Sequence, residues 1–371
     1  MGIHRGPNLI KDNLVFGYDS GYGVADNNTA TRFYEGESTD NKLRLFTSNT
    51  LSYPSNIYRC TVTEQNIVDV TAPNGQYSRY TGIDGSDNNQ VFYSYAGGGF
   101  NYTGQTITYS VYLKGSGTCH LTTYDNSSGY GTSGTITLIN EWVRYSYTRS
   151  VSSSASSHWS GVRGILSSTD VYVAASQMEI KGHATPFTPT TRSDTESLID
   201  LKKTIDIDVS NVSFNSTGQP EFDGTDDRID LGYAPITGIG DFTITSVYKT
   251  NTSAANTIIG NYPNGNLQFM GGYGLYIAGS CYFTSTPLPA GTYCATATRE
   301  NGVCKIYLNG KLQRTVNNSN DIGISSFRIG TNTSGTEPFN GGIYNIKVYD
   351  RALSADEVKQ NYNAYKNRFN I

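Results

Sequence analysis

Asp223, Asp226 and Asp227 stand close together in the segment Phe222–Ile229, which reads F-D-G-T-D-D-R-I. Ca²⁺ is bound by several oxygen ligands at short range, and a tight loop with three carboxylates can supply some of them. The same side chains can instead accept hydrogen bonds from backbone amides, as aspartates do in Asx turns. The sequence leaves both interpretations open, favours the turn, and indicates no cofactor other than Ca²⁺.

Tyrosine is the most abundant aromatic residue, with 29 tyrosines against 14 phenylalanines and 2 tryptophans. A tyrosine or tryptophan ring can stack on the C–H face of a sugar while its polar atom reaches water. Tyr124, Tyr130 and Trp159 lie near predicted turns between strands, and we predict that they stack on sugar rings. The alternative is that these rings fill half-buried strand positions, as aromatic residues do in many sheets.

The sequence carries no recognisable catalytic group. Hydrolysis of a glycosidic bond requires two carboxylates that flank the bond, and an E-x-D-x-x-E strand would point such acids into one cleft. No strand-like run has this pattern, and Glu35 and Glu37 lie in a glycine-flanked loop. The four histidines are scattered, without H-x-x-x-H or H-E-x-x-H spacing. We therefore predict that the protein is not an enzyme.

The composition indicates a β-rich protein of two domains. The chain has 371 residues, with 40 glycines and 11 prolines, which is typical of many short strands joined by turns. A mean hydropathy of −0.42 without a long apolar run predicts no membrane insertion, and the N-terminus shows no apolar signal segment. A net charge of −4 without a basic cluster gives no support for a nucleic-acid partner. Five cysteines without C-x-x-C spacing predict neither a zinc site nor a disulfide framework.

A strand followed by a capped helix is predicted near the C-terminus. Alternation predicts that one face of this strand meets the core, and that face carries Tyr344, Ile346 and Val348. Ser354 and Glu357 have the spacing of a capping box at the start of the helix. Val358 and Tyr362, four residues apart, predict the inward stripe of that helix.

The same stretch reads F-N-G-x-I-x-x-I-x-V-Y and then R-A-L-S-x-x-E-V, and it resembles the closing element of concanavalin A-like, laminin G-type lectin domains. Two upstream motifs stand in the order of that family, at Phe222–Ile229 and Val303–Gly310. The resemblance implies a β-sandwich over residues 193–371. Its first strand would come from an N-terminal segment, residues 1–35, where apolar alternation predicts a buried strand at residues 14–18. Docking of that segment on another subunit is the alternative.

Residues 36–192 contain strand-like runs separated by glycine and asparagine turns, which is typical of a sandwich or jelly roll. Three segments resemble the marks of a carbohydrate-binding-module jelly roll, namely Tyr109–Lys114, Glu141–Ser146 and Gln177–Glu179. We therefore predict an all-β protein of two β-sandwich or jelly-roll modules with one short C-terminal helix. The jelly roll would be inserted after the first strand of the lectin-like module, at an exposed loop.

Residues 17–34, GYDSGYGVADNNTATRFY, resemble the N-terminal stretch of structural proteins from tailed phages, cyanobacterial phages among them. The resemblance implies a virion protein, such as a head decoration, fibre or tail appendage, assembled in the host cytoplasm and exposed on the particle surface. Other virion proteins and further copies of the chain would be its partners, and host-surface glycans its ligands. A free glycan-binding protein is the main alternative, and a glycan hydrolase would lack its acid pair.

Overall fold

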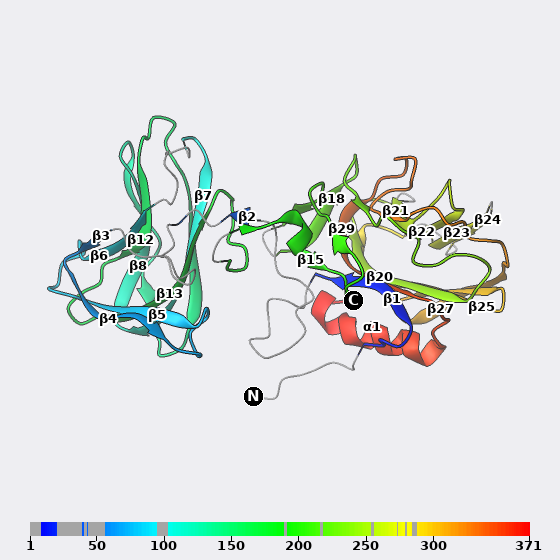
Figure 1. Ribbon diagram of the computed structural model, residues 1–371, viewed down its shortest axis with the longest axis horizontal. Coiled ribbons are helices and arrows are strands. Elements are labelled where there is room, and N and C mark those ends of the chain that lie inside the picture. The colour runs from blue at the N-terminus through cyan, green and yellow to red at the C-terminus, as the bar shows by residue number, and fades with distance from the viewer. Residues whose placement is uncertain are drawn as a thin grey trace. The chain divides into compact units, whose positions relative to one another are not determined.

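The protein is described by a computed structural model, and its chain divides into two compact units (Figure 1). One unit is made by Met1–Glu37 together with Ser193–Ile371, and the other by Ser38–Arg192. Both are built almost entirely from strands, so the predicted all-β fold is confirmed. No helix in the described residues is both long and apolar enough to cross a membrane. The described residues are 9–20, 39–40, 43, 56–94, 103–188, 191–215, 218–253, 256–272, 274–278, 280–283 and 288–371.

Two antiparallel sheets form the unit of residues 38–192. The strands of the first sheet are β3 (Asn56–Tyr58), β6 (Gln90–Ser94), β8 (Thr118–Asp125), β9 (Gly129–Thr132), β10 (Ile136–Thr137) and β12 (His158–Arg163). They lie in the order β10-β8-β12-β6-β3, and β9 also pairs with β8. The strands of the second sheet are β4 (Cys60–Val68), β5 (Gln76–Gly82), β7 (Thr106–Ser116), β11 (Val143–Ser150) and β13 (Asp170–Glu179). Their order is β11-β7-β13-β5-β4, and the short strands β2 (Thr39–Asp40) and β14 (Thr191–Arg192) pair separately.

The core of this unit lies between its two sheets. Val111 of β7 and Val171 of β13 belong to the same buried apolar cluster as Leu121 of β8 and Val162 of β12. Successive side chains of a strand point to opposite faces of a sheet. Residues at an odd spacing from these four on the same strands therefore lie on the outer faces of the sandwich, and these outer faces carry the two surfaces considered below.

The C-terminal unit is a second sandwich. The strands of its larger sheet are β1 (Leu14–Asp19), β17 (Ser213–Phe214), β18 (Pro220–Asp223), β20 (Phe242–Thr250), β25 (Gly291–Glu300), β26 (Val303–Leu308), β27 (Lys311–Asn317) and β29 (Asn340–Tyr349). Their order is β17-β18-β29-β20-β25-β26-β27, with β1 also paired to β29. The strands of the smaller sheet, in spatial order, are β19 (Ile229–Asp230), β28 (Arg328–Ile329), β21 (Asn256–Gly260), β22 (Leu267–Gly271), β23 (Gly274–Ile277) and β24 (Ser280–Phe283). Outside the two sheets lie the strand pair β15 (Leu198–Ile199) and β16 (Asp206–Ile207), a short 3-10 helix, Asp194–Glu196, and the C-terminal helix described below.

Strand β1 brings the N-terminal part of the chain into this unit. It pairs antiparallel with β29, with Phe16 opposite Val348 and Tyr18 opposite Ile346. Phe16 and Tyr18 are fully buried in the cluster of apolar residues between the two sheets. The alternation that predicts a buried strand at residues 14–18 thus corresponds to a strand that pairs within the same chain.

The face assignment predicted for the C-terminal strand is wrong at one end. Ile346 and Val348 belong to the core as predicted, but Ile343 joins them and Tyr344 does not. The pairing of β29 with β20 skips one residue between Ile343 and Asn345, which is the pattern of a β-bulge. A bulge shifts the alternation by one position, so residues before it point to the face opposite to the one predicted.

Helix α1 (Ala355–Phe369) packs on the face of the larger sheet that points away from the core. The predicted capping box is confirmed, because Ser354 Oγ accepts from the Glu357 N–H and the Glu357 carboxylate accepts from the Ser354 N–H at 2.8 Å. Tyr362 is half-buried and packs against the buried cluster that contains Tyr344 and Tyr365, so its predicted place in the inward stripe is confirmed. The buried residues of the helix are Val358, Asn361 and Tyr365.

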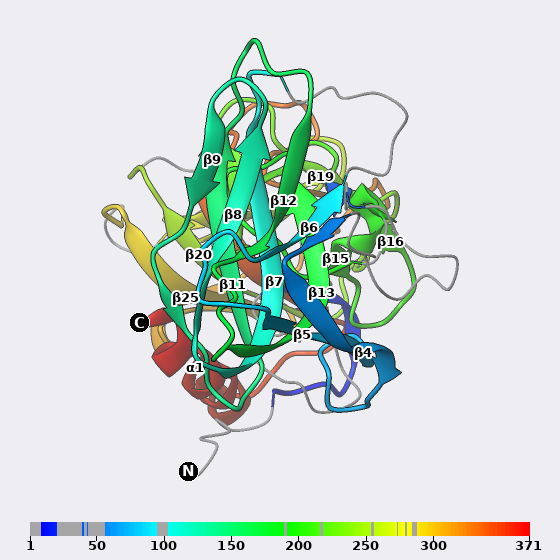
Figure 2. The ribbon, with the colours of Figure 1, turned by 90° about the vertical axis from the view of Figure 1, so that its left-hand side faces the viewer.

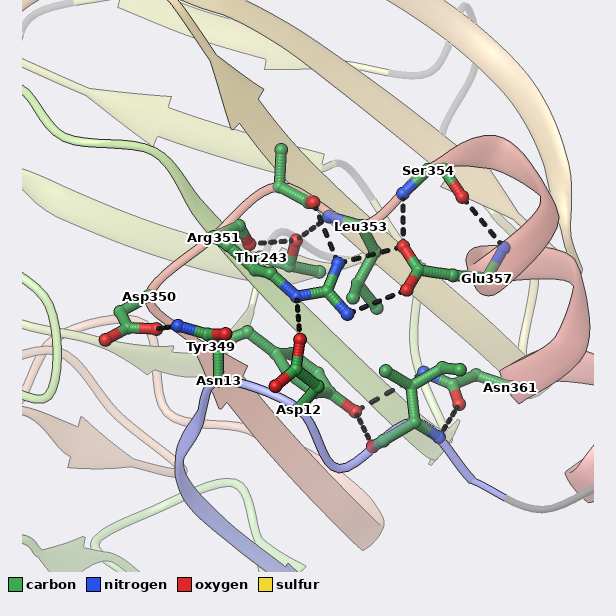
Figure 3. Close-up of polar contacts among 12 residues, drawn as sticks. Asp12, Asn13, Thr243, Tyr349, Asp350, Arg351, Leu353, Ser354, Glu357 and Asn361 are labelled. Atoms are coloured by element: carbon green, nitrogen blue, oxygen red, sulfur yellow. Dashed lines mark hydrogen bonds and ion pairs between the residues drawn. The ribbon is translucent and has the colours of Figure 1, made fainter.

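The segment before β1 is hydrogen-bonded to the C-terminal elements (Figure 3). The Ile10 N–H donates to Asn361 Oδ1 at 3.0 Å, and the Ile10 carbonyl accepts from the Tyr349 hydroxyl at 2.9 Å. Asn13 Nδ2 donates to Asp350 Oδ1 at 2.8 Å. Both backbone groups of Ile10 are therefore satisfied by side chains that lie more than three hundred residues later in the sequence.

Candidate functional site

An aromatic row, consisting of Tyr130, Tyr124 and Trp159, crosses three neighbouring strands of the β8 sheet. Tyr130 of β9 lies opposite Tyr124 of β8, which lies opposite Trp159 of β12. The ring centroids are 4.8 Å apart for Tyr124 and Tyr130, and 5.1 Å apart for Tyr124 and Trp159. Figure 2 shows the three strands beside one another. The structure therefore brings together all three residues that the sequence predicts to stack on sugars.

The aromatic row lies on the outer face of its sheet. Leu121 and Val162, at odd spacings from Tyr124 and Trp159 on the same strands, are buried in the core. The rings must therefore point to the opposite face. Tyr130 is 48% exposed, and the other two rings are half-buried. One side of the row therefore meets solvent, and sugar stacking by these rings stays a prediction.

The turn between β8 and β9 fixes the first two rings of the row. The buried Asp125 carboxylate accepts hydrogen bonds from the N–H groups of Ser127 at 3.0 Å and Ser128 at 2.5 Å. Gly129 follows with a φ of +73°, a conformation that favours glycine. Burial alone raises the pKa of Asp125, but the hydrogen bonds and the Arg149 guanidinium, 3.1 Å away, bring the pKa below its ordinary value. The carboxylate is therefore ionised and anchors the turn.

Polar side chains lie next to the aromatic row. The Arg163 guanidinium carbon is 4.3 Å from the centroid of the Tyr130 ring. Its Nη2 donates to Asn88 Oδ1 at 2.7 Å, and its Nε lies 3.5 Å from Asp87 Oδ2. The Asp87 side chain is 64% exposed, and its Oδ1 lies 3.9 Å from His120 Nε2. These groups provide hydrogen-bond donors and acceptors beside an aromatic surface, which is the composition of small-ligand sites.

Sequence reasoning missed Arg163 and His120 as neighbours of the row, although a signal was present. Arg163 follows Trp159 by four residues, and His120 precedes Tyr124 by four. An even spacing puts both members of each pair on one face of their strand. The strand pairing, which places Arg163 opposite His120, was not readable from the chain alone.

A buried histidine lies on the core side of the same sheet. His158 precedes Trp159 in β12, and only 4% of it is exposed. Burial and the positive charge of Arg149 lower its pKa, Asp125 opposes both effects, and the resulting pKa is about 4. The ring is therefore neutral near pH 7, and acid would place a charge directly under the sheet that carries the row.

The three predicted metal-binding aspartates also lie together, in the C-terminal unit. Asp223, Asp226 and Asp227 each offer a carboxylate oxygen, and these oxygens lie within 4.8 Å of one another. Asp227 Oδ2 accepts from the Asp223 N–H at 2.8 Å, and Asp223 Oδ1 accepts from the Thr225 N–H at 2.7 Å. Desolvation raises the pKa of Asp227, that backbone hydrogen bond lowers it, and the two neighbouring carboxylates raise it. The hydrogen bonds are those expected of a turn, and Ca²⁺ binding by this loop stays a prediction.

Two of the sequence predictions fall on segments that the structure does not describe. The phage-like stretch beyond residue 20 and the acidic pair Glu35 and Glu37 both lie outside the described residues. The sequence predicts domain boundaries after residues 35 and 192, and the structure divides the chain after Glu37 and after Arg192.

Comparison with protein families bears on the C-terminal unit. The sequence model of the laminin G-type group, described as the concanavalin A-like lectin/glucanases superfamily, matches residues 223–359. The C-terminal unit carries a concanavalin A-like domain. The matched range runs from β18 into helix α1, so it includes the closing strand and the capped helix that carry the resemblance in the sequence. No curated protein matches the chain.

Solved structures with a similar arrangement of strands include three of different origin. Domain 4 of AbnA, an extracellular arabinanase from Geobacillus stearothermophilus solved with arabinotriose, is 20% identical, with a TM-score of 0.35 over 42% of this chain and 81% of its own. The botulinum neurotoxin serotype D ligand-binding domain, solved with N-acetylneuraminic acid, is 17% identical, with a TM-score of 0.36 over 46% of this chain and 49% of its own. A CBM4 structure is 17% identical, with a TM-score of 0.26 over 34% of this chain and 81% of its own. At these scores the likenesses carry no functional argument, and the alignment spans about half the length of the neurotoxin domain.

Proposed function

We propose that this protein binds glycans without modifying them, and that the aromatic row is its binding surface. The observation that carries the proposal is the row itself. Three rings from β9, β8 and β12 lie within 5.1 Å of their neighbours on a solvent-facing side of a sheet. Aromatic rings in such a position bind the C–H faces of sugars, because the rings are large, rigid and amphipathic.

The dimensions of the row suit an extended sugar chain. Neighbouring strands lie about 4.8 Å apart, so a row across three strands spans roughly 10 Å. This length accommodates more than one sugar ring. Arg163 and Asp87 lie beside the Tyr130 end of the row and can form hydrogen bonds with ring hydroxyls. Stacking would supply most of the affinity, and these polar groups would orient the ligand.

The setting that we propose is the surface of a tailed-phage virion, where the protein would serve as a decoration, fibre or tail appendage. The support is the likeness of residues 17–34 to phage structural proteins, together with the concanavalin A-like domain, a type of module that phages reuse. Other virion proteins and further copies of the chain would then be its partners, and host-surface glycans its ligands. Light scattering with negative-stain imaging tests this setting: a stable oligomer with projecting modules supports it, and a monomer favours a free glycan-binding protein.

The binding proposal is tested with a glycan array of host polysaccharides and the full chain in its native assembly. Ligands found on the array are then titrated into Tyr130→Ala and Tyr130→Phe variants. We expect Tyr130→Ala to weaken binding at least about tenfold because it removes a stacking surface, and Tyr130→Phe to bind almost normally because it retains the ring. An array without signal, or equal affinities for the two variants, would contradict the proposal.

A further inference from the structure

A second group of aromatic and basic side chains lies on the other sheet of the jelly-roll unit. We call Lys114, Trp142 and Arg144 the donor patch. Lys114 Nζ lies 6.0 Å from the centroid of the Trp142 ring and 5.7 Å from that of Tyr172. The Arg144 guanidinium carbon lies 5.8 Å from the centroid of the Tyr112 ring. The patch thus combines two cations, an indole N–H and aromatic rings.

The donor patch faces away from the core. Val111 and Leu113 of β7 are buried in the core cluster, and Tyr145 of β11 packs against it. The neighbouring residues of β7 and β11 therefore point to the outer face of this sheet. The aromatic row lies on the outer face of the opposite sheet. The two surfaces are separated by the core of the unit, and each can be tested without the other.

Several donors of the patch have no acceptor. Trp142 Nε1 and Arg144 Nε are both shielded from solvent and form no hydrogen bond. Arg144 Nη2 donates to Ser110 Oγ at 2.8 Å, a neutral partner. Within the described residues, neither Lys114 nor Arg144 forms an ion pair with a carboxylate. Leaving charged or polar donors half-buried without hydrogen-bond partners is unfavourable, so an acceptor supplied by a ligand would stabilise the patch.

The other carboxylates on this face form no ion pair with the donor patch. Arg79 lies on β5. Its Nε is 2.7 Å from Asp170 Oδ1, and its Nη1 is 3.1 Å from Glu64 Oε1. The Tyr77 hydroxyl donates to the other Glu64 oxygen at 2.5 Å. Both acids are thus engaged by Arg79. Glu179 attracts Arg144 and Asp69 attracts Lys114, but within the described residues neither carboxylate forms an ion pair with the donor patch.

We propose that the donor patch binds a carboxylate-bearing sugar, such as a uronic or sialic acid unit of a glycan. The carboxylate would accept a hydrogen bond from the Lys114 ammonium, which is strong because both partners are charged, and hydroxyl groups of the glycan would accept from the Arg144 guanidinium. The sugar ring would lie against a group of aromatic rings. The ring centroids of Tyr77 and Tyr172 are 5.3 Å apart, and those of Tyr77 and Trp142 are 6.2 Å apart. The rings favour a sugar acid over a small inorganic anion, which has no apolar face to place on them.

The chain offers a direct readout, because its only two tryptophans lie one in each surface. Trp142 belongs to the donor patch and Trp159 to the aromatic row. In a ¹H–¹⁵N spectrum the two indole N–H signals are assigned with Trp142→Phe. The probes are oligogalacturonate, a hyaluronan oligomer and sialyllactose, with neutral oligogalactose as the comparison. We expect at least one acidic probe to shift the Trp142 signal, and oligogalactose to leave it in place.

Affinity for the responsive probe is then measured by calorimetry. Arg144→Gln and Lys114→Met should each weaken binding at least about tenfold, since a charge-assisted contact is lost. Lys311→Gln removes an exposed charge from the C-terminal unit and should bind normally. An unchanged Trp159 signal shows that the variants are folded.

The proposal is overturned if no acidic probe moves the Trp142 signal, or if the Arg144, Lys114 and Lys311 variants weaken binding equally. The outcome is independent of the proposed function. Tyr130→Ala should leave the response of Trp142 to acidic probes intact. Conversely, binding at the aromatic row should survive Arg144→Gln.

Discussion

Replacement of His158 by glutamine should make the jelly-roll unit resistant to mild acid. Burial holds the pKa of His158 at about 4, against 6.5 for an exposed histidine. The unfolded chain therefore binds the proton more tightly than the folded chain, and stability is lost as the pH falls from 6.5 toward 4. These two pKa values correspond to a loss of about 2.5 kcal/mol between about pH 7.5 and about pH 4.5. The pKa of Asp125 is lowered, so its protonation reduces the unfolding free energy mainly below the ordinary aspartate pKa of 3.8, outside this interval.

The assay is urea unfolding followed by tryptophan fluorescence. Trp142 and Trp159 both lie in the jelly-roll unit, so the signal reports on that unit alone. Wild-type protein should lose about 2.5 kcal/mol of unfolding free energy over this interval, and His158→Gln should lose much less. His183→Gln, which removes a histidine outside the core, should behave as wild type. If wild type and His158→Gln lose the same free energy, the buried neutral imidazole is not the origin of the acid sensitivity.

Three further predictions concern the C-terminal unit. Burial lowers the pKa of Lys347 to about 8, which favours folding as the pH rises from about 8 toward about 10, whereas burial raises the pKa of the Cys294 and Cys304 thiols and opposes folding over the same interval. Calorimetry should therefore show that Lys347→Met loses more unfolding free energy than wild type between about pH 8 and about pH 10. Hydrogen bonds from Arg351 hold the pKa of Glu357 at about 2, and Glu357→Gln should lower the unfolding free energy by about 1–2 kcal/mol in thermal or urea unfolding because it weakens both this pair and the helix cap. Asp223→Ala should lower the unfolding temperature because a turn amide loses its acceptor, while about 5 mM CaCl₂ should leave the wild type unchanged. A Ca²⁺-dependent rise that Asp226→Asn abolishes would instead establish the metal site.

Local patterns in the sequence predicted much of the fold. The capping box at Ser354 and Glu357 depends only on residues three apart, and it forms as predicted. The burial of Ile346 and Val348 follows from alternation within one strand. Tyr344 failed because the bulge beside it arises from the pairing of β29 with β20, and a partner strand is invisible in a single-strand pattern.

The candidate site shows the same limit. Each aromatic residue of the row was identified from its type and its nearness to a turn, but their mutual contacts depend on the order β9-β8-β12. Arg163 reaches Tyr130 although thirty-three residues separate them in the sequence. The donor patch was missed altogether, because its character depends on which donors lack partners. That property belongs to the folded chain and has no signature in the sequence of Lys114, Trp142 and Arg144.

The position of the jelly roll within the chain follows from a comparison of two free energies. Joining β1 to the rest of its unit across a long intervening segment costs little, since each doubling of a loop adds only about 0.6 kcal/mol. A segment tenfold longer than an ordinary connection therefore adds about 2 kcal/mol. Against this, β1 buries Phe16 and Tyr18 completely, and each such side chain stabilises the fold by about 1.5–3 kcal/mol. Burial of these two rings alone offsets the cost of the long connection, so the C-terminal unit can accommodate an independently folded module between its first strand and the rest of its sheet.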